Sequence, residues 1–597
     1  MASMSLCSKL FIFFGLISIL YFYHVRNSGA LSPLGTAGSA PSKQNGLLGL
    51  TGSKKHPIEL LVEHARVKHV NMVNRQSKTL DQAVTEYKRR YSREPPPGFH
   101  HWYKAAVDAN VPIVDEYDTV MAAFEPFWSV SGKEIRARVQ EAISPPVGKT
   151  PIIGVHLKDQ NVSLTYNGNM NRPWYGLILK DWIEHHMDHL PNMEIAFNSH
   201  DEPEVVVPRD ELERSLEGCP APQKHEIGKP KEQAEMHDPE VVYFDFLRRH
   251  RTWDRVIESC PLDSASRSRK SSEPDKSADY TDGPLFIQNI TRAKDICEET
   301  DAASLHGFFT SPDGFVLTNS LVPVFTKSKA SSFQDLLLPA VDYDSRLSEG
   351  TYKEYNPDED MPWEEKKNHL YWAGTSIDGY YQDSNWKNMQ RVRFVKNMNN
   401  PSLPVALMRR DEKSGRWKAH NDTMGSLSKY ADVKFTLQDM CAEKTCEEMR
   451  DPENGVVWKG KEPATEPYAN RFLMDVDGHT FTERFRRLLS SRSLVFKMTM
   501  FQEWHNDFLE PWVHYVPITL GMKELPETLR FLAETPEGQV IAKEIAEAGR
   551  EWVGQAWRVV DMRIATFRIL LEYARLYGEE RDRTGECPWD RKGRGKS

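Results

Sequence analysis

Residues 472–484 read FLMDVDGHTFTER, and they predict a strand that runs into a tight turn and then a helix. The mainly apolar run 472–476 has strand character, and Gly478 permits a tight turn with close approach to the backbone. Thr480 and Glu483 have the spacing of a capping box, which marks a helix start. Such a start can bind an anion, and Arg484 in the first turn can fork onto a phosphate. In the alternative interpretation, Arg484 pairs with a nearby acid and Gly478 only turns the chain.

Similar apolar runs alternate with helical segments along the middle of the chain. This alternation is typical of α/β domains with parallel sheets. The further strand candidates are Ile152–Val155, Glu194–Phe197, Glu204–Val207, Leu370–Trp372, Val433–Leu437 and Ser493–Phe496. After Pro517 the chain is predicted to be helical. One apolar helix face there is formed by Ala556, Val560, Ile564, Phe567, Leu571 and Ala574.

The N-terminal segment predicts membrane attachment. Residues 10–23 are mainly apolar and carry no charge, and we interpret residues 10–25 as an uncleaved signal-anchor helix, with a cleaved signal peptide as the alternative. Residues 1–9 would form a short cytosolic tail, and residues 26–57, rich in Gly, Ser and Pro, a flexible stalk. The predicted location is a Golgi or other secretory-pathway membrane, with a single-pass type II topology and a luminal body.

Cysteines and glycosylation sequons fit a luminal body. Six of the seven cysteines follow the predicted anchor, an even number that is compatible with disulfides, and Cys441 and Cys446 are close enough in sequence to bridge. Sequons begin at Asn161, Asn289 and Asn421, although such tripeptides also arise by chance. The net charge is −9 over 597 residues and no Lys/Arg stripe stands out, so a nucleic-acid partner is not expected.

A polar loop follows the strand candidate at residues 194–197. It contains Asn198, Asp201 and Glu202, and ligands of open α/β sheets bind at the carboxyl ends of strands. A carboxylate there can take a proton from an acceptor hydroxyl. The alternative is that Asp201 only caps a turn before Pro203.

A second set of polar groups follows the strand candidate at residues 370–372. Gly374, Thr375 and Ser376 can hydrogen-bond a diphosphate, and Arg391 and Arg393 can add positive charge. The alternative is a loop followed by a solvated basic helix. Residues 475–477 read DVD, a metal-clamp pattern, but Asp-x-Asp is frequent by chance and a metal role is not favoured. The aromatic stretch 504–517 is interpreted as a packed domain junction.

Taken in order, these segments resemble glycosyltransferase family 90, which holds fungal capsule-associated xylosyltransferase-like proteins and animal protein O-glucosyltransferases. The resemblance rests on residues 198–203, 260–264, 372–376, 477–484, 493–497 and 511–517, and residues 91–103 look like the fungal branch. It implies a GT-B fold of two Rossmann-like domains, a UDP-sugar donor, inversion at the anomeric carbon, and no required metal or other cofactor.

The resemblance also implies roles for individual residues. Asp201 matches the general base, with Glu202 as the second candidate, and Arg484 matches a diphosphate-binding arginine. The donor pocket would be lined by Gly374, Thr375, Ser376, Asp477 and Gly478. Many relatives carry Arg where this chain has Ala373, and Arg391 or Arg393 would then compensate.

The expected organisation places the chemistry between two domains. The predicted segments are a helical stem at 58–145, an acceptor-side domain at 146–330, a donor domain at 331–520 and C-terminal helices with a tail at 521–597. The predicted function is inverting transfer of a sugar, xylose favoured over glucose, to a polysaccharide, glycolipid or glycoprotein acceptor. The alternatives are a catalytically inactive member that binds a glycan or partner, and a metal-dependent transferase of another architecture.

Overall fold

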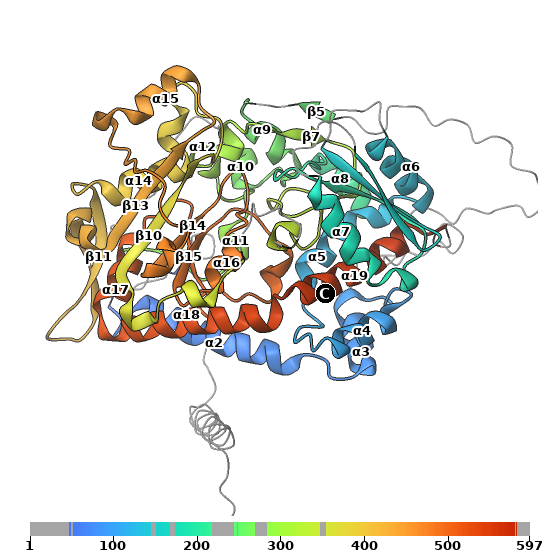
Figure 1. Ribbon diagram of the computed structural model, residues 1–597, viewed down its shortest axis with the longest axis horizontal. Coiled ribbons are helices and arrows are strands. Elements are labelled where there is room, and N and C mark those ends of the chain that lie inside the picture. The colour runs from blue at the N-terminus through green and yellow to red at the C-terminus, as the bar shows by residue number, and fades with distance from the viewer. Residues whose placement is uncertain are drawn as a thin grey trace, which may run out of the picture.

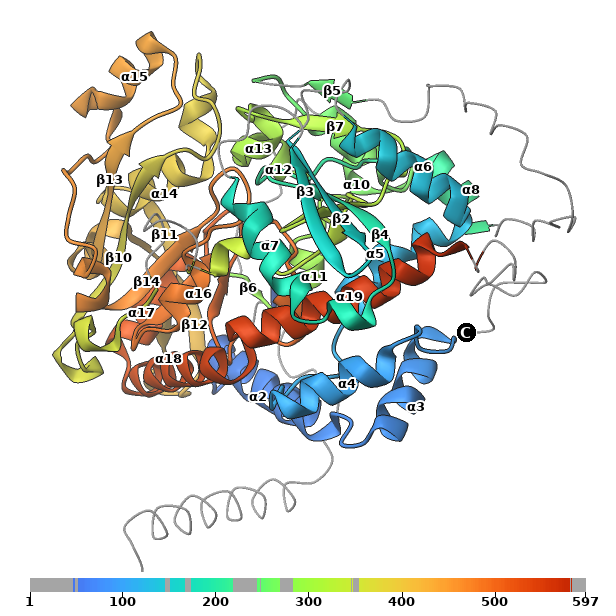
Figure 2. The same ribbon diagram turned by 45° about the vertical axis from the view of Figure 1, so that its right-hand side comes forward.

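Two five-stranded sheets form the centre of the molecule (Figures 1 and 2). The computed structural model describes residues 47–48, 52–144, 151–166, 173–217, 244–246, 249–268, 283–344, 346, 354–579 and 581. The sheet on the left of Figure 2 is formed by residues 367–518, and the one on the right by residues 152–337.

The sheet formed late in the sequence is entirely parallel. Its strand order is β13-β10-β14-β15-β16, and each neighbouring pair runs parallel. The strands are β10 (Lys367–Ser376), β13 (Ala431–Gln438), β14 (Asn470–Val476), β15 (Leu494–Met498) and β16 (Val516–Ile518). The α/β class with a parallel sheet is therefore confirmed. The helices between these strands are α14 (Gln390–Asn399), α15 (Glu443–Arg450) and α16 (Phe485–Leu489).

The sheet formed early in the sequence is mixed. In the order β3-β2-β4-β8-β9, β2 is antiparallel to both neighbours, whereas β4, β8 and β9 run parallel. Its strands are β2 (Ile152–Lys158), β3 (Asn161–Tyr166), β4 (Met193–Asn198), β8 (Val324–Thr326) and β9 (Leu336–Leu337). The last of these lies beyond residue 330, where the boundary between the two domains was predicted.

Residues 204–207 do not form the predicted strand. The backbone N–H groups of Glu204 and Val205 both donate to the carboxylate of Asp335, each at 2.9 Å, instead of to a neighbouring strand. Val205 makes only an isolated bridge with Thr318. The apolar run is buried by this loop arrangement, so its hydrophobicity did not specify a strand.

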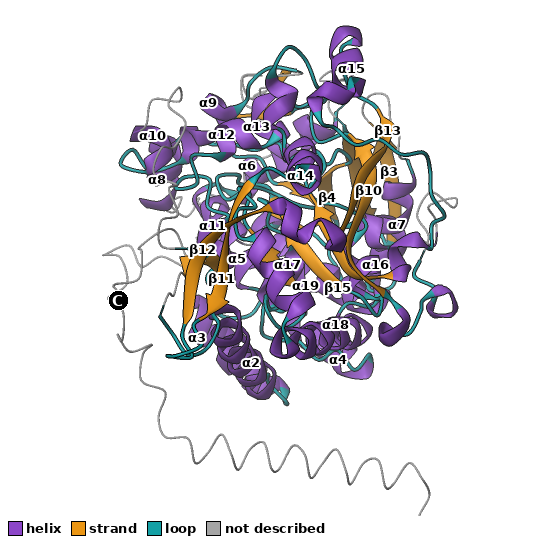
Figure 3. Cartoon of the chain, turned by 90° about the vertical axis from the view of Figure 1, so that its left-hand side faces the viewer, coloured by secondary structure: helices purple, strands orange, loops and turns teal. Residues whose placement is uncertain are grey.

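Smaller elements complete the described part of the fold. The two-stranded sheets pair β1 (Leu47–Leu48) with β6 (Phe286–Ile287), β5 (Phe244–Phe246) with β7 (Val316–Thr318), and β11 (Pro404–Arg410) with β12 (Trp417–Thr423). The β11–β12 ribbon packs beside α17 (Leu525–Glu534) (Figure 3). The other helices are α8 (Arg209–Glu217), α9 (Trp253–Val256), α10 (Ala265–Ser268), α11 (Ile290–Ala293), α12 (Ala302–Leu305) and α13 (Gly307–Thr310).

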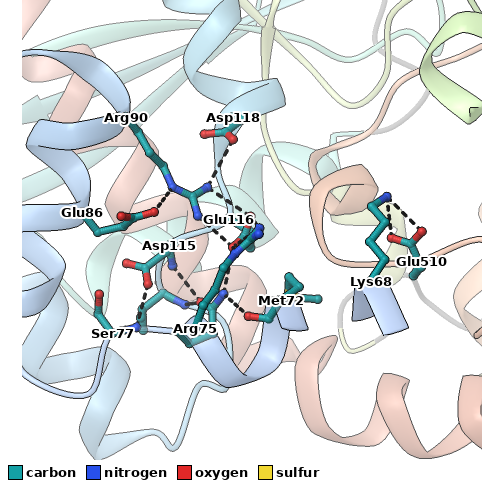
Figure 4. Close-up of polar contacts among 12 residues, drawn as sticks. Lys68, Met72, Arg75, Ser77, Glu86, Arg90, Asp115, Glu116, Asp118 and Glu510 are labelled. Atoms are coloured by element: carbon teal, nitrogen blue, oxygen red, sulfur yellow. Dashed lines mark hydrogen bonds and ion pairs between the residues drawn. The ribbon is translucent and has the colours of Figure 1, made fainter. Parts of the chain in front are cut away.

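Residues 57–143 are mainly helical and are tied together by Glu116. This buried carboxylate accepts from Arg75 (Nη2, 3.0 Å), Arg90 (Nη2, 2.9 Å) and Gln76 (Nε2, 2.9 Å), and Arg90 also reaches Asp118 (Figure 4). Burial opposes ionisation of Glu116, but the arginines outweigh it and lower the pKa of that carboxyl group. The helices are α2 (Pro57–Arg75), α3 (Leu80–Tyr91), α4 (Phe99–Asp108), α5 (Asp118–Phe124) and α6 (Gly132–Ile143).

The C-terminal helices connect the two halves of the fold. Helix α18 (Pro536–Ala556) packs on β15 and α2, whereas α19 (Val559–Tyr577) packs on α4, α6 and α7 (Trp174–Glu184) beside the early sheet (Figure 2). The predicted helix face starting at Ala556 is therefore divided between two helices. Helix α19 begins with its own capping box, in which the backbone N–H of Arg558 donates to Asp561 at 2.6 Å.

Two disulfides are formed among the described cysteines. They join Cys260 with Cys297, and Cys441 with Cys446, so the short bridge that the sequence spacing allowed is formed. The three sequon asparagines, Asn161, Asn289 and Asn421, are all exposed.

The predicted membrane location is corrected by the structure. Within the ranges described above, no helix combines the length and the apolar character needed to cross a bilayer. A single-pass type II protein of a Golgi or other secretory membrane is therefore not supported. The predicted anchor at residues 10–25 and most of the predicted stalk at 26–57 lie outside the described residues.

Candidate active site

The loop that follows β4 is fixed by the last residue of that strand. The buried side chain of Asn198 donates from Nδ2 to the carbonyl of Glu202 at 2.6 Å. Its Oδ1 accepts from the backbone N–H of His200 at 2.8 Å. One asparagine thus closes the turn that carries Asp201 and Glu202.

This loop meets the loop that follows β14 in the other sheet. The hydroxyl of Thr480 donates to the carbonyl of Asp201 at 2.7 Å, and Nδ1 of His479 lies 2.9 Å from Oε1 of Glu202. Because both loops follow the carboxyl ends of their strands, the two sheets direct their ligand-binding ends toward one place.

The predicted capping box is wrong. Helix α16 begins at Phe485 with Arg484 as its N-cap, and the hydroxyl of Thr480 serves the contact with Asp201 instead. A helix of five residues that starts this late does not provide the expected N-terminal anion site next to Gly478. The positive charge near this turn is therefore that of Arg484 itself.

The carboxylate of Asp201 is held by a buried lysine. Nζ of Lys327, directly after β8, lies 2.7 Å from Oδ1 of Asp201 and 3.3 Å from Oδ2 of Asp342. The hydroxyl of Tyr175 in α7 donates to Asp342, and Nζ of Lys327 lies 4.2 Å from the centre of that tyrosine ring. The Lys327 side chain is 0% exposed and that of Asp201 is 30% exposed. Asp201 therefore lies at the solvent-facing end of this row of contacting side chains.

Glu202 faces inward and pairs with His479. Burial alone would lower the pKa of His479, but the carboxylates of Glu202 and Asp201 outweigh burial and raise it. The other ring nitrogen, Nε2, lies 3.1 Å from the sulfur of Met440. Of the two predicted bases, Glu202 is thus buried in an ion pair, whereas Asp201 is partly exposed.

Arg484 is oriented by a fully buried carboxylate. Its Nη2 lies 3.6 Å from Oδ1 of Asp475, and the other oxygen of Asp475 accepts from Nζ of Lys497 at 2.6 Å. Burial opposes ionisation of Asp475, but Lys497 and Arg484 prevail and lower its pKa. The Arg484 side chain remains 22% exposed whereas Asp475 is 0% exposed, so the guanidinium can contact a ligand while Asp475 supports it from behind.

Asp477 and Gly478 form the turn itself. Asp477 is buried and accepts from the backbone N–H of Met500 at 2.9 Å, and Nε2 of His306 lies 3.4 Å from the same oxygen. The carbonyl of Gly478 accepts from Nε2 of Gln390 at 3.0 Å. Within the described ranges, no group of three or more His, Cys, Asp or Glu side chains is arranged to hold a metal ion.

Arg391 connects this turn with the end of β10. The buried guanidinium donates to the carbonyls of Thr375 at 2.8 Å and Asp477 at 3.0 Å. The hydroxyl of Ser376 donates to the carbonyl of Asp439 at 3.1 Å, and a side chain on Gly374 would lie 2.7 Å from the Trp372 ring. These contacts show residues 374–376 and Arg391 fixing the backbone at this edge of the sheet.

Arg393 lies elsewhere. It donates to the carbonyls of Asn388 and Leu520, each at 2.8 Å, and burial lowers its pKa to about 10. It lines a cavity of about 520 Å³ between α14, β11 and residues 519–526. Among the described residues that line this cavity, Arg393 is the one that was predicted to bind the donor. The structure thus brings Asp201, Glu202, Asp477, Gly478 and the end of β10 to one region and leaves Arg393 outside it.

The family to which this region belongs follows from comparison with known proteins. The family model described as "Glycosyl transferase family 90" matches residues 313–584. Residues 313–584 are similar to this family and are called the family 90 region below. The family 90 region contains residues 374–376, 477–478 and Arg484, whereas Asp201 and Glu202 lie upstream of it and are connected to it through Thr480 and His479.

Similar curated proteins carry glucosyltransferase names. The chain is 36% identical over 117 residues to "O-glucosyltransferase rumi homolog" of Aedes aegypti, which covers 19% of this chain and 28% of the relative. It is 23% identical over 264 residues to "O-glucosyltransferase rumi" of Drosophila melanogaster (42% and 55%) and 24% identical over 274 residues to "Protein O-glucosyltransferase 1" of Homo sapiens (43% and 57%). The alignments thus span little more than half of these relatives, or less.

Several residues of the site were not predicted from the sequence. The sequence did not point to Lys327, Asp342 or Tyr175, because they reach the site only through contacts between segments that are distant in the sequence. His479 and Thr480 lay inside the quoted stretch, but the pattern there indicated helix capping and not contact with the other sheet. The available signal for Lys327 in the sequence was a lysine that directly follows a short, mainly apolar run.

Proposed function

We propose that this chain is an inverting glycosyltransferase that moves a sugar from a UDP-sugar to a hydroxyl group of a glycan or glycoprotein. The observation that carries the proposal is the contact between Asp201 and Thr480 at 2.7 Å. It places a partly exposed carboxylate beside the turn of the family 90 region that leads to Arg484. A carboxylate base and a cationic group near one turn would suit transfer between an acceptor hydroxyl and a charged leaving group.

The proposed reaction is a single displacement. The carboxylate of Asp201 removes the proton from the acceptor hydroxyl while that oxygen forms a bond to the anomeric carbon. The bond from this carbon to the diphosphate oxygen breaks, and its electron pair leaves with UDP. Positioned base catalysis typically contributes about 10²–10⁴-fold.

Arg484 would stabilise the departing diphosphate. Its charge is preorganised by Asp475, whose position is fixed in turn by Lys497. Such a fixed cation lowers the energy of the developing negative charge without reorganisation during the reaction. We therefore propose that the reaction requires no metal ion or other cofactor. The test of this point is activity in the presence of a chelator.

The two sheets are proposed to be the two halves of a GT-B architecture. The parallel order of the late sheet and the convergence of the β4 and β14 loops support this proposal. Residues 374–376, 477 and 478 would shape the donor pocket mainly through their backbone. The side chains of Ser376, Arg391 and Asp477 are already hydrogen-bonded to backbone groups of this region.

We propose two sugars, glucose and xylose, as the candidates for the group that the UDP-sugar donor carries. The names of the relatives favour glucose, and the resemblance of residues 91–103 to the fungal branch favours xylose. An inactive binding protein is the competing function. Its support is Ala373, which lies in β10 at a position where the resemblance to family 90 implies an arginine, and which is packed against the hydrophobic core.

The deciding experiment measures release of UDP by the full chain from UDP-glucose and UDP-xylose, with EDTA and polysaccharide or glycoprotein acceptors present. Wild-type protein and an Asp201→Asn variant are compared. Acceptor-stimulated release that falls at least about 10²-fold in the variant would support the proposal. UDP binding by calorimetry without turnover of any donor would favour the inactive binding protein, and equal turnover by both proteins would exclude Asp201 as the base.

A further inference from the structure

A buried lysine stands directly behind the proposed base. Lys327 is the first residue after β8, which is the parallel neighbour of β4, the strand that carries the Asp201 loop. Its side chain is 0% exposed and its Nζ lies 2.7 Å from Oδ1 of Asp201. A lysine is almost never fully buried without a partner, because desolvation of its charge is costly.

The surroundings of Lys327 hold its ammonium group in one place. Asp342, in the short turn at residues 341–343, lies 3.3 Å from Nζ and is itself bound by the hydroxyl of Tyr175. The rings of Tyr175 and Phe481 lie 4.2 Å and 5.4 Å from Nζ at their centres, within the range of cation–π attraction. The lysine thus reaches Asp201 from an environment that leaves it little freedom.

We infer that Lys327 is the positioning residue of the base: it fixes the carboxylate of Asp201 in orientation and keeps it ionised in the resting site. This inference rests on the proposed function and adds to it a residue that acts through Asp201 without touching substrate. Among the described residues, the charges near Asp201 include Asp342, behind the lysine, and His479 with Glu202. Lys327 is a cation that directly contacts the proposed base.

A base held in this way has a recognisable pH dependence. A neighbouring cation favours the ionised carboxylate, and its removal makes the carboxylate easier to protonate by about 1–3 pH units. The base is active only when it is deprotonated. Loss of Lys327 therefore shifts the acidic limb of the rate profile to higher pH, in addition to lowering the rate. A purely structural lysine would lower the rate or the stability without moving that limb.

The test compares Lys327→Met with Lys329→Met in acceptor-dependent UDP release from pH 5 to 9. Lys329 is also buried and follows the same strand, but it donates to the carbonyl of Asp335 at 2.9 Å and serves as the matched control. For Lys327→Met we expect a rate reduced about 10–100-fold, an acidic limb moved up by about one pH unit, and unchanged calorimetric affinity for UDP. Lys329→Met should keep the wild-type limb.

The Lys327→Met variant leaves Asp342 buried without its cation, so a Lys327→Met/Asp342→Asn double variant removes both charges and protects folding. The double variant should show the same shift of the acidic limb. A wild-type limb in a folded variant that lacks Lys327 would overturn the inference. Absence of acceptor-dependent turnover in wild-type protein would instead refute the proposed function on which the inference rests. Full activity of Asp201→Asn would exclude Asp201 as the base and would overturn the inference while leaving the transferase activity standing.

Discussion

The early and late sheets each pair a carboxylate with a buried lysine, yet the two pairs differ in exposure. Lys327 holds Asp201 at 2.7 Å, and Lys497 holds Asp475 at 2.6 Å. Asp201 is 30% exposed, whereas Asp475 is 0% exposed and lies behind Arg484. The same type of ion pair therefore has two different settings. The outward pair holds a carboxylate that solvent can reach, and the inward pair holds a carboxylate that supports Arg484.

The largest expected difference between the pairs concerns turnover. Asp201→Asn should lower acceptor-dependent turnover by about 10²–10⁴-fold with unchanged UDP affinity, because the substitution removes only the proposed base. Asp475→Asn should weaken UDP binding as well, since Arg484 loses its support. Steady-state kinetics and calorimetry on both variants check this contrast. It fails if the two substitutions change the same parameter by the same factor.

Lys497→Met tests the inward pair through stability. Removing this lysine leaves the fully buried Asp475 with the Thr482 hydroxyl as a hydrogen-bond donor and Arg484, at 3.6 Å, as a nearby cation. Breaking a buried ion pair typically costs about 3–5 kcal/mol. Denaturant unfolding should therefore show a large loss. A Lys497→Met/Asp475→Asn double variant should recover part of the loss, and no recovery would contradict the pairing argument.

The contact between the two sheets should depend on pH through His479. Its pKa is raised in the folded protein above the ordinary value of 6.5, so its ion pair with Glu202 stabilises fully below about pH 6.5 and is lost as pH rises through the folded pKa. His479→Gln should thus cost about 1.5–3 kcal/mol near pH 6 and little near pH 9. Thermal melts at both pH values check the sign, and an equal loss at both would contradict it.

The smallest effect on donor binding is expected for Arg393→Met. Its guanidinium donates to the carbonyls of Asn388 and Leu520, away from the site, so UDP affinity should not change measurably. Leaving these carbonyls without a donor should lower stability by about 1–3 kcal/mol. Arg484→Met is the matched comparison and should weaken UDP binding. A weaker affinity for UDP in Arg393→Met would instead support the predicted role of Arg393 in donor binding.

Local patterns predicted the strands because hydrophobic runs are local. The predicted positions of β2, β4, β10, β13, β14 and β15 are confirmed, with ends that differ by a few residues. Two local patterns misled. Thr480 donates to a carbonyl of the loop after β4 instead of capping a helix. Residues 204–207 form only an isolated bridge to β7, and the backbone N–H groups of Glu204 and Val205 bind Asp335.

The site was predictable only in part, because its decisive contacts join distant residues. Asp201 and Lys327 are 126 residues apart in sequence, and Asp201 and Thr480 are 279 apart. The identities of Asp201 and Arg484 came from motif resemblance and their roles remain predictions. Which oxygen contacts which cation depends on tertiary packing, which no spacing rule contains.

Helix α19 gives the order of synthesis a consequence for folding. Arg568 and Glu572 of this helix are buried among residues from the beginning of the chain: Glu572 accepts from the hydroxyl of Tyr87 at 2.8 Å, and Trp102 donates to the carbonyl of Ile564 at 3.2 Å. A ribosome makes these partners more than 450 residues before it makes the helix that covers them. The N-terminal half therefore leaves the ribosome with an unfinished core, and it depends on late completion or on chaperone shielding until its last helix arrives.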